Sequence, residues 1–232
     1  MATFAKYRAR DALLILRHNA REIKNPSNED IDPRRTPLNY SLLNRPLSED
    51  IEHYKMRKKE IHAHNRKDVI TLVGLVITAP GDLPEKDERS FFETSLTFVS
   101  ERFGAENIVQ AVVHHDESGQ PHMHIGLLPV VADAKYGEKF CAKEVITRQE
   151  LNTFHPDFQR YLDNCGIHAR VFTGVTTAQG GNRSVADMKR IRDLERERDF
   201  AFARLAEIER GKEHTRSRWN ARVDAEVERR RW

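Results

Sequence analysis

The feature that most constrains this fold is residues 108–131, where two apolar runs flank a short polar turn. The runs, 108–113 and 125–131, are rich in β-branched residues, and the turn contains Ser118 and Gly119. Strands of this character joined by a turn of this kind predict a β-hairpin. The hairpin in turn predicts a sheet at the centre of the fold.

The predicted hairpin brings three histidines together on one face. His122 and His124 are alternate residues of one strand and share a face, while His114 ends the preceding strand within cross-strand reach. Neutral imidazole is the commonest metal ligand, and three protein ligands leave positions open for substrate oxygen. Asp116 and Glu117 in the turn are placed to orient these ligands or to add an oxygen ligand. The alternative is that the histidines are polar residues on the solvated face of a hairpin.

The sequence Pro-His-Met-His at residues 121–124 favours chemistry on nucleic acid. HUH-type nucleases, which cut single-stranded DNA, carry such a His-hydrophobe-His element. A histidine-triad nucleotide hydrolase would need a third alternating histidine where Gly126 stands, and a zinc finger would need cysteine ligands nearby. A second His-x-His pair, His62 and His64, falls in a predicted helix, where the two rings would diverge, so we interpret it as surface residues. Metal-dependent action on nucleic acid is therefore the first hypothesis.

Composition sets outer bounds on these hypotheses. A chain of 232 residues holds one substantial core, and its net charge of +3 means that any anion-binding surface must come from local clustering. Cys141 and Cys165 are the only cysteines, so a disulfide framework is not indicated. No apolar run approaches the roughly 20 residues that cross a bilayer, and the first residues lack a signal-peptide pattern. A cytoplasmic protein is expected.

Hydrophobic periodicity predicts alternating strands and helices before the last quarter of the chain. The strongest strand is 69–78, apolar enough to be central in a sheet. The order strand, helix, strand, strand predicts an α/β sandwich of a central sheet with helices on one face. The similarity of Pro-His-Met-His to the element of HUH nucleases implies an HUH-type two-layer sandwich with an antiparallel central sheet. Pro156 predicts a helix start near His155 or a kink. The other predicted elements are a strand over 1–9, helices over 11–24, 48–63, 88–103 and 147–164, and short strands near Phe140 and over 169–172.

Composition also divides the chain into two parts. Residues 1–175 are predicted to form the folded domain, and residues 176–232 a linker followed by one long charged helix. The linker belongs to the Gly- and Thr-rich stretch 173–184. From Val185 onward a broken apolar stripe runs among alternating charges, which predicts either a coiled-coil seam for a homodimer or another partner, or a solvated single helix.

Two segments outside the hairpin are candidates for binding nucleic acid. Residues 25–46 contain four prolines and several arginines, which predicts an ordered, irregular segment that either lies along a ligand or connects two elements. Along a ligand, Tyr40 would stack on bases and Arg35 would grip phosphate. The helix 48–63 and the residues after it carry a local basic patch, which includes Lys58, Lys59, Arg66 and Lys67.

Three stretches of the chain resemble the MobV-type plasmid mobilisation relaxases, also called Mob/Pre plasmid recombination proteins. His18-Asn19 with Arg21 resembles the first motif of that family. Residues 28–40, which read Asn-x-Asp-Ile-x-Pro-x-Arg-Thr-x-Leu-Asn-Tyr, resemble the second nearly residue for residue. Residues 114–124, His-x-Asp-Glu followed by Pro-His-Met-His, resemble the third, with a longer turn that a hairpin can absorb.

The resemblance implies an enzyme that nicks one strand at a plasmid transfer origin and stays attached to the 5′ end, initiating conjugative mobilisation. Residues 1–175 would be the relaxase domain, and its partner would be single-stranded or hairpin origin DNA. A divalent metal is implied at the histidine cluster, with Mn²⁺ expected first and Mg²⁺ or Zn²⁺ as alternatives. The expected site residues are His18 and Glu117 for catalysis, His114, His122 and His124 for metal, and Arg21, Arg35, Asn39, Tyr40, Lys58, Lys59, Arg66 and Lys67 for DNA.

The nucleophile is either a tyrosine or a histidine. Tyrosine is the usual choice in HUH nucleases, and Tyr7, Tyr40 and Tyr54 are available. The resemblance points instead to His18, whose attack would give a phosphoramidate. A neutral imidazole is nucleophilic near pH 7, whereas a phenol of pKa about 10 must first lose a proton. We therefore expect His18 to be the nucleophile.

Two further interpretations are consistent with the same residues. The chain could be a non-catalytic DNA-binding module in which a metal with a closed set of protein ligands only staples the hairpin. It could also be a rolling-circle replication initiator of related fold. Such an enzyme should use a tyrosine in a helix after the histidine pair, and Tyr161 is the tyrosine in such a predicted helix.

Overall fold

The computed structural model describes residues 2–24, 28, 30–172, 174 and 185–230 of the chain. The chain divides into two compact units, Met1–Thr173 and Gly174–Trp232. The linker predicted over 173–184 lies outside the described residues, apart from Gly174.

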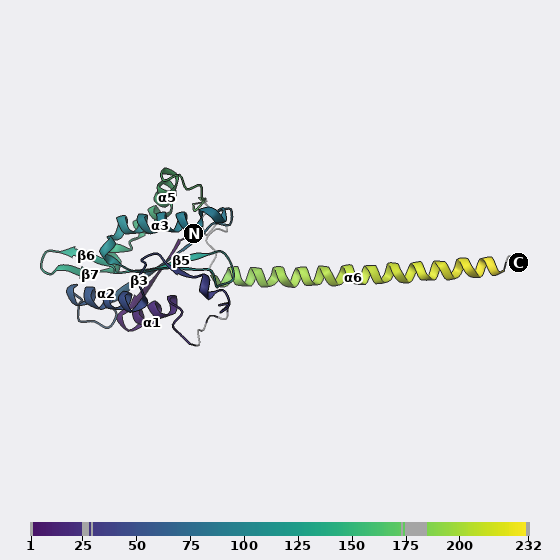
Figure 1. Cartoon of the computed structure of the whole chain (residues 1–232), viewed down its shortest axis with the longest axis horizontal. Helices are drawn as coiled ribbons and strands as arrows, with labels where there is room; N and C mark the ends of the chain where they lie inside the picture. Colours follow the sequence, from purple (N-terminus) through teal and green to yellow (C-terminus); the bar gives the residue numbers. More distant parts are fainter. Residues whose placement is uncertain (1, 25–27, 29, 173, 175–184, 231–232) are drawn as a thin grey trace. The chain divides into compact units, whose positions relative to one another are not determined.

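The first unit is built on an antiparallel sheet, as predicted. Its strands follow the order β1 (Ala2–Arg8), β3 (Ile70–Thr78), β5 (His122–Leu127), β4 (Ile108–His114) and β2 (Tyr40–Ser41). The strands β4 and β5 form the predicted hairpin, in which His114 lies directly opposite His122. A separate two-stranded ribbon, β6 (Val130–Asp133) and β7 (Gly137–Phe140), follows the hairpin and projects from one end of the unit (Figure 1).

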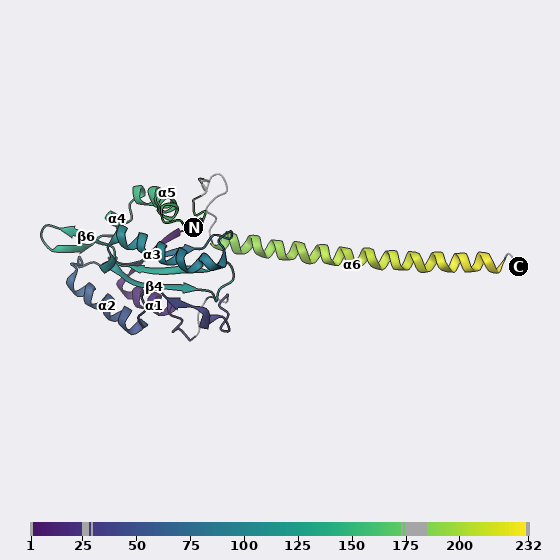
Figure 2. The same ribbon diagram turned by 45° about the horizontal axis from the view of Figure 1, so that its top comes forward.

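Helices cover both faces of this sheet (Figure 1, Figure 2). On one face lie α1 (Ala9–Asn19) and α2 (Leu47–Glu60), and on the other α3 (Glu88–Phe103) and α5 (Arg148–Asn164). Short helices complete the unit, namely α4 (Ala142–Val145) and the 3-10 turns Thr36–Leu38, Glu85–Asp87 and Ala105–Asn107.

The expectation that the helices lie on one face of the sheet is wrong, and β3 shows why. Neighbouring residues of this strand point to opposite faces, and both faces are apolar. Leu72 packs with α1 and α2, while Val73 and Leu75 pack with α3 and α5. A strand that reads as a continuous apolar run, rather than as an alternation, is buried on both faces.

Each face has its own core. Four phenylalanines in contact dominate the α3–α5 core. Phe91 contacts Phe158, Phe158 contacts Phe98, and Phe98 contacts Phe154, with ring centroids 5.1 to 6.2 Å apart. On the α1–α2 side, Gly126 of β5 lets helix α1 approach closely, because a Cβ there would lie 3.1 Å from Leu16 Cδ2. The last turn of α1 is thereby held against the centre of the sheet.

Several element boundaries differ from prediction for local reasons. Helix α5 begins after Thr147, whose side chain accepts a hydrogen bond from the Glu150 N–H, and it includes Pro156 within a single helix. The edge strand predicted over 169–172 is wrong. Residues there form no strand, and the Val171 N–H donates instead to the Gln159 side chain at 2.8 Å.

The predicted helix 48–63 ends at Glu60, so His62 and His64 do not lie in a helix. His62 instead makes a backbone bridge to Lys139 of β7, and its ring stacks on Tyr136 with a centroid separation of 3.5 Å. The two imidazoles stay close, at 5.2 Å, because the extended backbone does not turn them apart.

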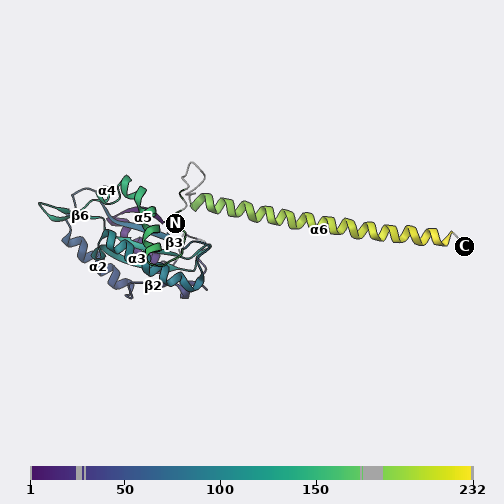
Figure 3. The ribbon, with the colours of Figure 1, turned by 90° about the horizontal axis from the view of Figure 1, so that it is seen from above.

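The second unit is the long helix α6 (Val185–Arg229), which Figure 3 shows as one element. Its large apolar side chains are exposed within the unit, among them Leu194, Leu205, Ile208 and Trp219. Among the described helices, none is long and apolar enough to span a membrane.

Candidate metal centre and active site

The β4–β5 hairpin places three histidines on the sheet face that α1 covers. His114 ends β4, and His122 and His124 lie on β5 on either side of Met123, whose side chain is buried in the opposite core. The ring centroids are 5.5, 4.6 and 5.0 Å apart for the pairs 114–122, 114–124 and 122–124. The turn adds Glu117, so that four potential ligand atoms lie within 4.8 Å of one another.

The chemistry of these side chains fits a divalent metal. Burial, followed by the charges of neighbouring histidines, lowers the pKa of His124 well below its usual value, and burial and Arg21 lower the pKa of His114 to about 4. Both rings are therefore neutral near pH 7, and each has one nitrogen lone pair that can accept a hydrogen bond or coordinate a metal. The Nε2 atom of His124 is buried and has no hydrogen-bond partner among the described residues. A buried nitrogen without a partner is costly unless a ligand completes it.

The backbone sets the orientation of His114. Its Nε2 atom lies 2.6 Å from the carbonyl oxygen of Asn19, at the end of α1. Because a carbonyl can only accept, Nε2 carries the proton and Nδ1 carries the lone pair. Nδ1 lies 3.0 Å from Nη2 of Arg21 and 3.9 Å from the carboxylate of Glu117. The end of α1 therefore selects the tautomer that offers Nδ1 to the cluster.

Arg21 makes hydrogen bonds to both carboxylates of the hairpin turn. Its Nε and Nη2 atoms donate to the two oxygens of Asp116 at 2.9 and 2.6 Å, and Nη2 also donates to Glu117 at 2.7 Å. Burial alone would raise the pKa of Asp116, but hydrogen bonds from Arg21 and Thr36 hold it well below its usual range. Arg21 adopts a left-handed backbone with φ of 59°, and its side chain is only 9% exposed. Arg21 was expected to bind DNA, and this stays a prediction: its Nε and Nη2 atoms contact Asp116, Glu117 and His114, while its buried Nη1 atom has no hydrogen-bond partner among the described residues.

His18 lies in the last turn of α1, beside this cluster. Burial and the positive charge of Arg21 lower its pKa, while Glu117 and Asp116 oppose the shift. It lines a cavity of about 320 Å³ together with residues of the 28–40 segment, including Ile31 and Pro33. The imidazole of His18 is therefore neutral near pH 7, next to an open space and within the electrostatic reach of the candidate metal ligands.

Asn39 and Tyr40 lie against the start of the hairpin turn. The Asn39 side-chain oxygen accepts a hydrogen bond from the His115 N–H at 2.7 Å, and the Tyr40 ring lies 5.9 Å from the His115 ring. Burial, followed by Glu88, raises the pKa of Tyr40 to about 12. A phenol of that pKa is a weak nucleophile near pH 7. This contrast with His18 favours the histidine.

Tyr161 is on the wrong side of the sheet for the replication-initiator alternative. It packs with the α3–α5 core, and its hydroxyl donates to Glu101 at 3.1 Å. The three histidines lie on the opposite face of the sheet, since Met123 between His122 and His124 points into that core. The sheet therefore separates this tyrosine from the candidate metal ligands.

The predicted basic patch lies far from the histidines. Arg66 and Lys67 precede β3, whose last residue, Thr78, pairs with His122. Ile70 and Thr78 are eight residues apart on this strand, which rises about 3.3 Å per residue, so the two ends of β3 are roughly 25 Å apart. All four residues of the patch are exposed: Lys58 and Lys59 lie in the last turn of α2, and Arg66 and Lys67 lie at this distant end of the sheet. Arg35 is also exposed, in the loop before the first 3-10 turn.

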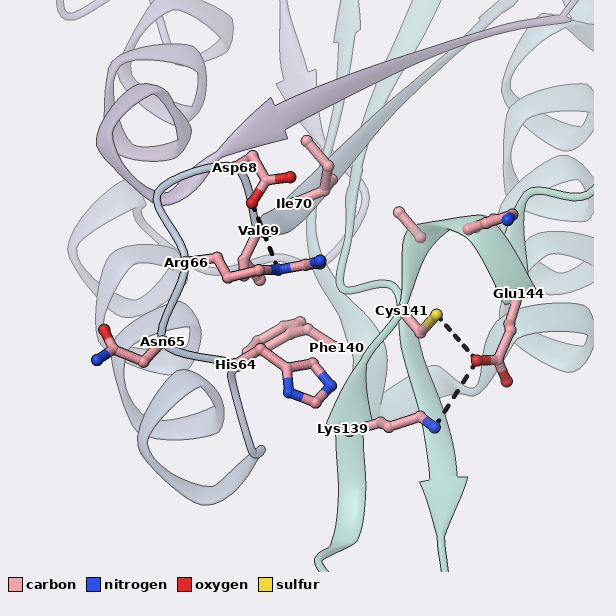
Figure 4. Close-up of a pocket in the computed structure, with 12 residues that line it drawn as sticks. His64, Asn65, Arg66, Asp68, Val69, Ile70, Lys139, Phe140, Cys141 and Glu144 are labelled. Carbon is pink, nitrogen blue, oxygen red and sulfur yellow. Dashed lines mark hydrogen bonds and ion pairs between the residues drawn. The ribbon is translucent and has the colours of Figure 1, made fainter.

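A cavity of about 470 Å³ occupies the same distant end of the sheet (Figure 4). Arg66 and Lys139 line it, but each cation faces a carboxylate, with Arg66 Nε 3.5 Å from Asp68 and Lys139 Nζ 3.7 Å from Glu144. Cys141 Sγ also donates to Glu144 at 3.0 Å. The cavity is lined by three basic side chains, Arg66, Lys139 and Lys143, and two acidic ones, Asp68 and Glu144, and it contains no group of metal-ligand candidates such as the histidine cluster among the described residues.

Sequence patterns do not reveal the residues that contact the cluster from the side of α1 and the 28–40 segment. The Thr36 hydroxyl donates a hydrogen bond to Asp116 at 2.9 Å, and in the sequence Thr36 is distinguished only as part of the 28–40 motif. Gln110 is fully buried and bonds Asn19 and Asp50. A signal for Gln110 was present, because it is the one polar side chain within the apolar run 108–113.

Comparison with known proteins places the chain in a family. The family model described as plasmid recombination enzyme matches residues 1–171. A plasmid recombination enzyme of Streptococcus agalactiae is 34% identical over 182 residues, covering 75% of this chain and 35% of that protein. One of Lactiplantibacillus plantarum is 33% identical over 200 residues, covering 83% of this chain and 54% of that protein. The chain thus spans about a third to a half of the length of these relatives.

A solved structure agrees with the sequence comparison. The MobM relaxase domain (MOBV; Mob_Pre), in a Mn-bound crystal structure with plasmid pMV158 oriT DNA, is 30% identical with a TM-score of 0.68. The match covers 82% of this chain and 97% of that chain. The resemblance to MobV relaxases and the antiparallel α/β fold are both confirmed. On the match over residues 1–171, this chain belongs to the Mob_Pre family of plasmid recombination enzymes.

Proposed function

We propose that this chain carries the relaxase activity of a plasmid mobilisation protein, nicking one DNA strand at a transfer origin and remaining attached to the 5′ phosphate. The observation that carries the proposal is the neutral imidazole of His18 beside a cluster of four potential metal ligands, one of which has a buried, unpartnered nitrogen. A nucleophile and an electrophilic centre within one site are the minimum that phosphodiester transfer needs.

The residues that would hold the metal are His114, His122, His124 and Glu117. Three nitrogens and one carboxylate oxygen suit Mn²⁺ or Zn²⁺ better than Mg²⁺, which prefers oxygen ligands. The Mn-bound MobM relaxase domain supports Mn²⁺ as the first choice. When bound, the metal would stabilise negative charge on a non-bridging phosphate oxygen. Glu117 would serve as a ligand, held in place by Arg21.

His18 would carry out the chemical step. A lone pair of its imidazole attacks phosphorus, an N–P bond forms, and the bond from phosphorus to the 3′ oxygen breaks. The second ring nitrogen loses its proton while the departing 3′ oxygen gains one, so the exchange balances and leaves a phosphoramidate and a free 3′ hydroxyl. Because one ester-like bond replaces another, the 3′ hydroxyl can reverse the step and reseal the strand.

A trapping experiment tests the nucleophile. The protein is incubated with Mn²⁺ and an oligonucleotide that carries a cognate origin. The oligonucleotide is designed so that the fragment ending in the new 3′ hydroxyl dissociates after the cut, and the peptide that carries the remaining DNA is then mapped. We expect an acid-labile adduct on His18, absent from His18→Ala but present in Tyr40→Phe. An acid-stable adduct on the Tyr40 peptide would overturn the assignment of His18. Failure of the parent protein to form any adduct would overturn the enzymatic proposal and favour the non-catalytic DNA-binding alternative.

The DNA partner is proposed to be single-stranded or hairpin origin DNA, as in the oriT complex of the MobM relaxase domain. Asn39, Tyr40 and Arg35 belong to the segment beside the hairpin turn, close to where the cut phosphate would lie. The basic patch of Lys58, Lys59, Arg66 and Lys67 would contact DNA roughly 25 Å away, a distance of about seven base pairs at 3.4 Å each.

A homodimer through α6 is proposed for the second unit. Exposed apolar residues recur at heptad-like spacing through Leu194, Leu205 and Ile208. In a parallel, in-register pair of such helices, Arg204 of one copy would face Glu209 of the other. Sedimentation of the intact protein and of Leu205→Glu tests this, with a dimer that dissociates in the variant as the expected result. A monomeric parent would support the solvated single helix instead.

A further inference from the structure

A chain of buried polar side chains runs behind the candidate active site. Arg45 Nε donates to Asp50 at 2.6 Å, and Asp50 accepts from Gln110 Nε2 at 3.2 Å. Gln110 Nε2 also donates to the Leu16 carbonyl at 3.2 Å, and Gln110 Oε1 accepts from Asn19 Nδ2 at 3.0 Å. Asp50, Gln110 and Asn19 are 2%, 0% and 5% exposed. The links among Asp50, Gln110 and Asn19 are therefore made away from solvent, whereas the Arg45 side chain at the end of the chain is 24% exposed.

The two ends of the chain meet different parts of the fold. At one end, Arg45 Nη2 donates to the Val109 carbonyl at 2.5 Å, which anchors it to β4. At the other end, Gln110 makes two hydrogen bonds to the last turn of α1, one to the Leu16 carbonyl and one to the Asn19 side chain. The Asn19 carbonyl accepts from His114 Nε2, and His18 is the preceding residue. The amide of Gln110 thus connects strand β4 to the helix turn that carries His18 and that contacts His114.

Packing alone does not require this arrangement. An apolar side chain at residue 110 would continue the apolar run of β4 and avoid the cost of burying an amide and a carboxylate. A hydrophobic contact, however, is non-directional and leaves the rotation of a helix end loosely fixed. The amide fixes that rotation because its donor and acceptor must each meet one group of the last turn. A displacement of 1 Å at a reacting group can cost about a hundredfold in rate.

We propose that Gln110, oriented by the Arg45–Asp50 pair, is a positioning residue that sets the direction of the His18 imidazole and the tautomer of His114. The proposal rests on the relaxase function proposed above, because it assigns a consequence to how those two histidines are held. Gln110 itself contacts neither DNA nor metal. It acts through the last turn of α1.

The test compares Gln110→Met with a matched control. Methionine has a similar length and keeps the packing but makes none of the three hydrogen bonds. Thr71→Val is the control, because it removes a buried hydrogen bond to Tyr54, 2.7 Å long, between α2 and β3 on the same face of the sheet. Four quantities are measured for each protein: the melting temperature, the affinity for Mn²⁺ alone, the dissociation constant for the origin oligonucleotide, and the single-turnover rate of adduct formation at saturating oligonucleotide.

If Gln110 positions the site, Gln110→Met lowers the single-turnover rate roughly 10- to 100-fold and the Mn²⁺ affinity about tenfold, while the dissociation constant for DNA is unchanged. Thr71→Val keeps the parent rate and Mn²⁺ affinity even where its melting temperature falls as far. Parent-like rate and Mn²⁺ affinity in Gln110→Met, or equal losses in the control, would overturn the proposal.

Two further measurements keep the test decisive. Should Gln110→Met not fold, Asn19→Ala removes one of the same hydrogen bonds, and a parent-like rate and Mn²⁺ affinity in that variant would count against positioning. Absence of an adduct in the parent refutes the relaxase function and not the positioning role. In that case the Mn²⁺ affinity, and the ¹⁵N shifts of the His114 ring nitrogens, still report whether Gln110 orients the cluster.

Discussion

Removing Arg21 should destabilise the protein more than any surface substitution of an arginine. In Arg21→Ala the carboxylate of Asp116, which is 0% exposed, loses a two-point ion pair, and breaking a buried pair of this kind costs about 3–5 kcal/mol. Thr36 still donates to Asp116 and offsets a small part of that cost. For a unit of this size each kcal/mol lowers Tm by about 2–4 °C, so a fall of roughly 10 °C is expected.

Two related variants separate the causes. Arg21→Gly loses the same ion pair but relieves the left-handed backbone at φ of 59°, so it should be roughly 1 kcal/mol more stable than Arg21→Ala. Arg89→Ala is the control, because Arg89 pairs with Glu93 on an exposed helix surface and should lose only about 0.5 kcal/mol.

The pH dependence gives an independent check. Because the folded-state pKa of Asp116 is lowered, the stability that its ionised form contributes is present above about pH 4, the ordinary aspartate value, and is lost as pH falls through the folded pKa. The difference between parent and Arg21→Ala should therefore narrow as pH falls below about 4. Calorimetric unfolding from neutral to acid pH measures both effects. A loss below about 1 kcal/mol at pH 7, or no recovery when Asp116→Asn is added to Arg21→Ala, would refute the buried-pair reasoning.

The other predictions concern metal, DNA and packing. The double variant His122→Ala, His124→Ala should retain the fold but lose bound Mn²⁺, and full metal content by elemental analysis would contradict the ligand assignment. Replacing Lys58 and Lys59 by Ala should reduce the salt dependence of DNA binding, lowering the slope of log K against log salt by about 1.4 to 1.8, and an unchanged slope would remove the patch from the interface. Gly126→Ala should displace the end of α1 and slow adduct formation more than it weakens DNA binding, since its Cβ would lie 3.1 Å from an α1 side chain.

The hairpin and the helix 88–103 were predictable because each depends on a local pattern. Alternation in 122–124 determines which side chains share a face, and a strand's period of two leaves little freedom once one face is buried. The predicted helix coincides with α3, and Gly104 ends it with a φ of 88°, a conformation that favours glycine. These features require no knowledge of what lies across the sheet.

The rest depended on contacts between distant segments. The pairing of Arg21 with the turn joins residues 95 positions apart, and no periodicity reveals it. The placement of helices on both faces follows from the whole sheet rather than from any one strand. His62 lies outside α2 because its backbone pairs with β7, a tertiary contact that overrides local helix propensity.

The position of β5 in the middle of the sheet has a consequence for amide hydrogen exchange. Two of the potential ligands, His122 and His124, lie on this central strand, whose amides should exchange only when the sheet itself opens. The nucleophile candidate lies instead in the last turn of α1, which hydrogen bonds from Gln110 and His114 tie to the neighbouring strand β4. Exchange measured by mass spectrometry should therefore find the ligand strand in the slowest segment, and the last turn of α1 should exchange faster in Gln110→Met than in the parent. In that variant the helix turn that carries His18 would open separately from the metal ligands, and the coordination site on β5 would stay closed.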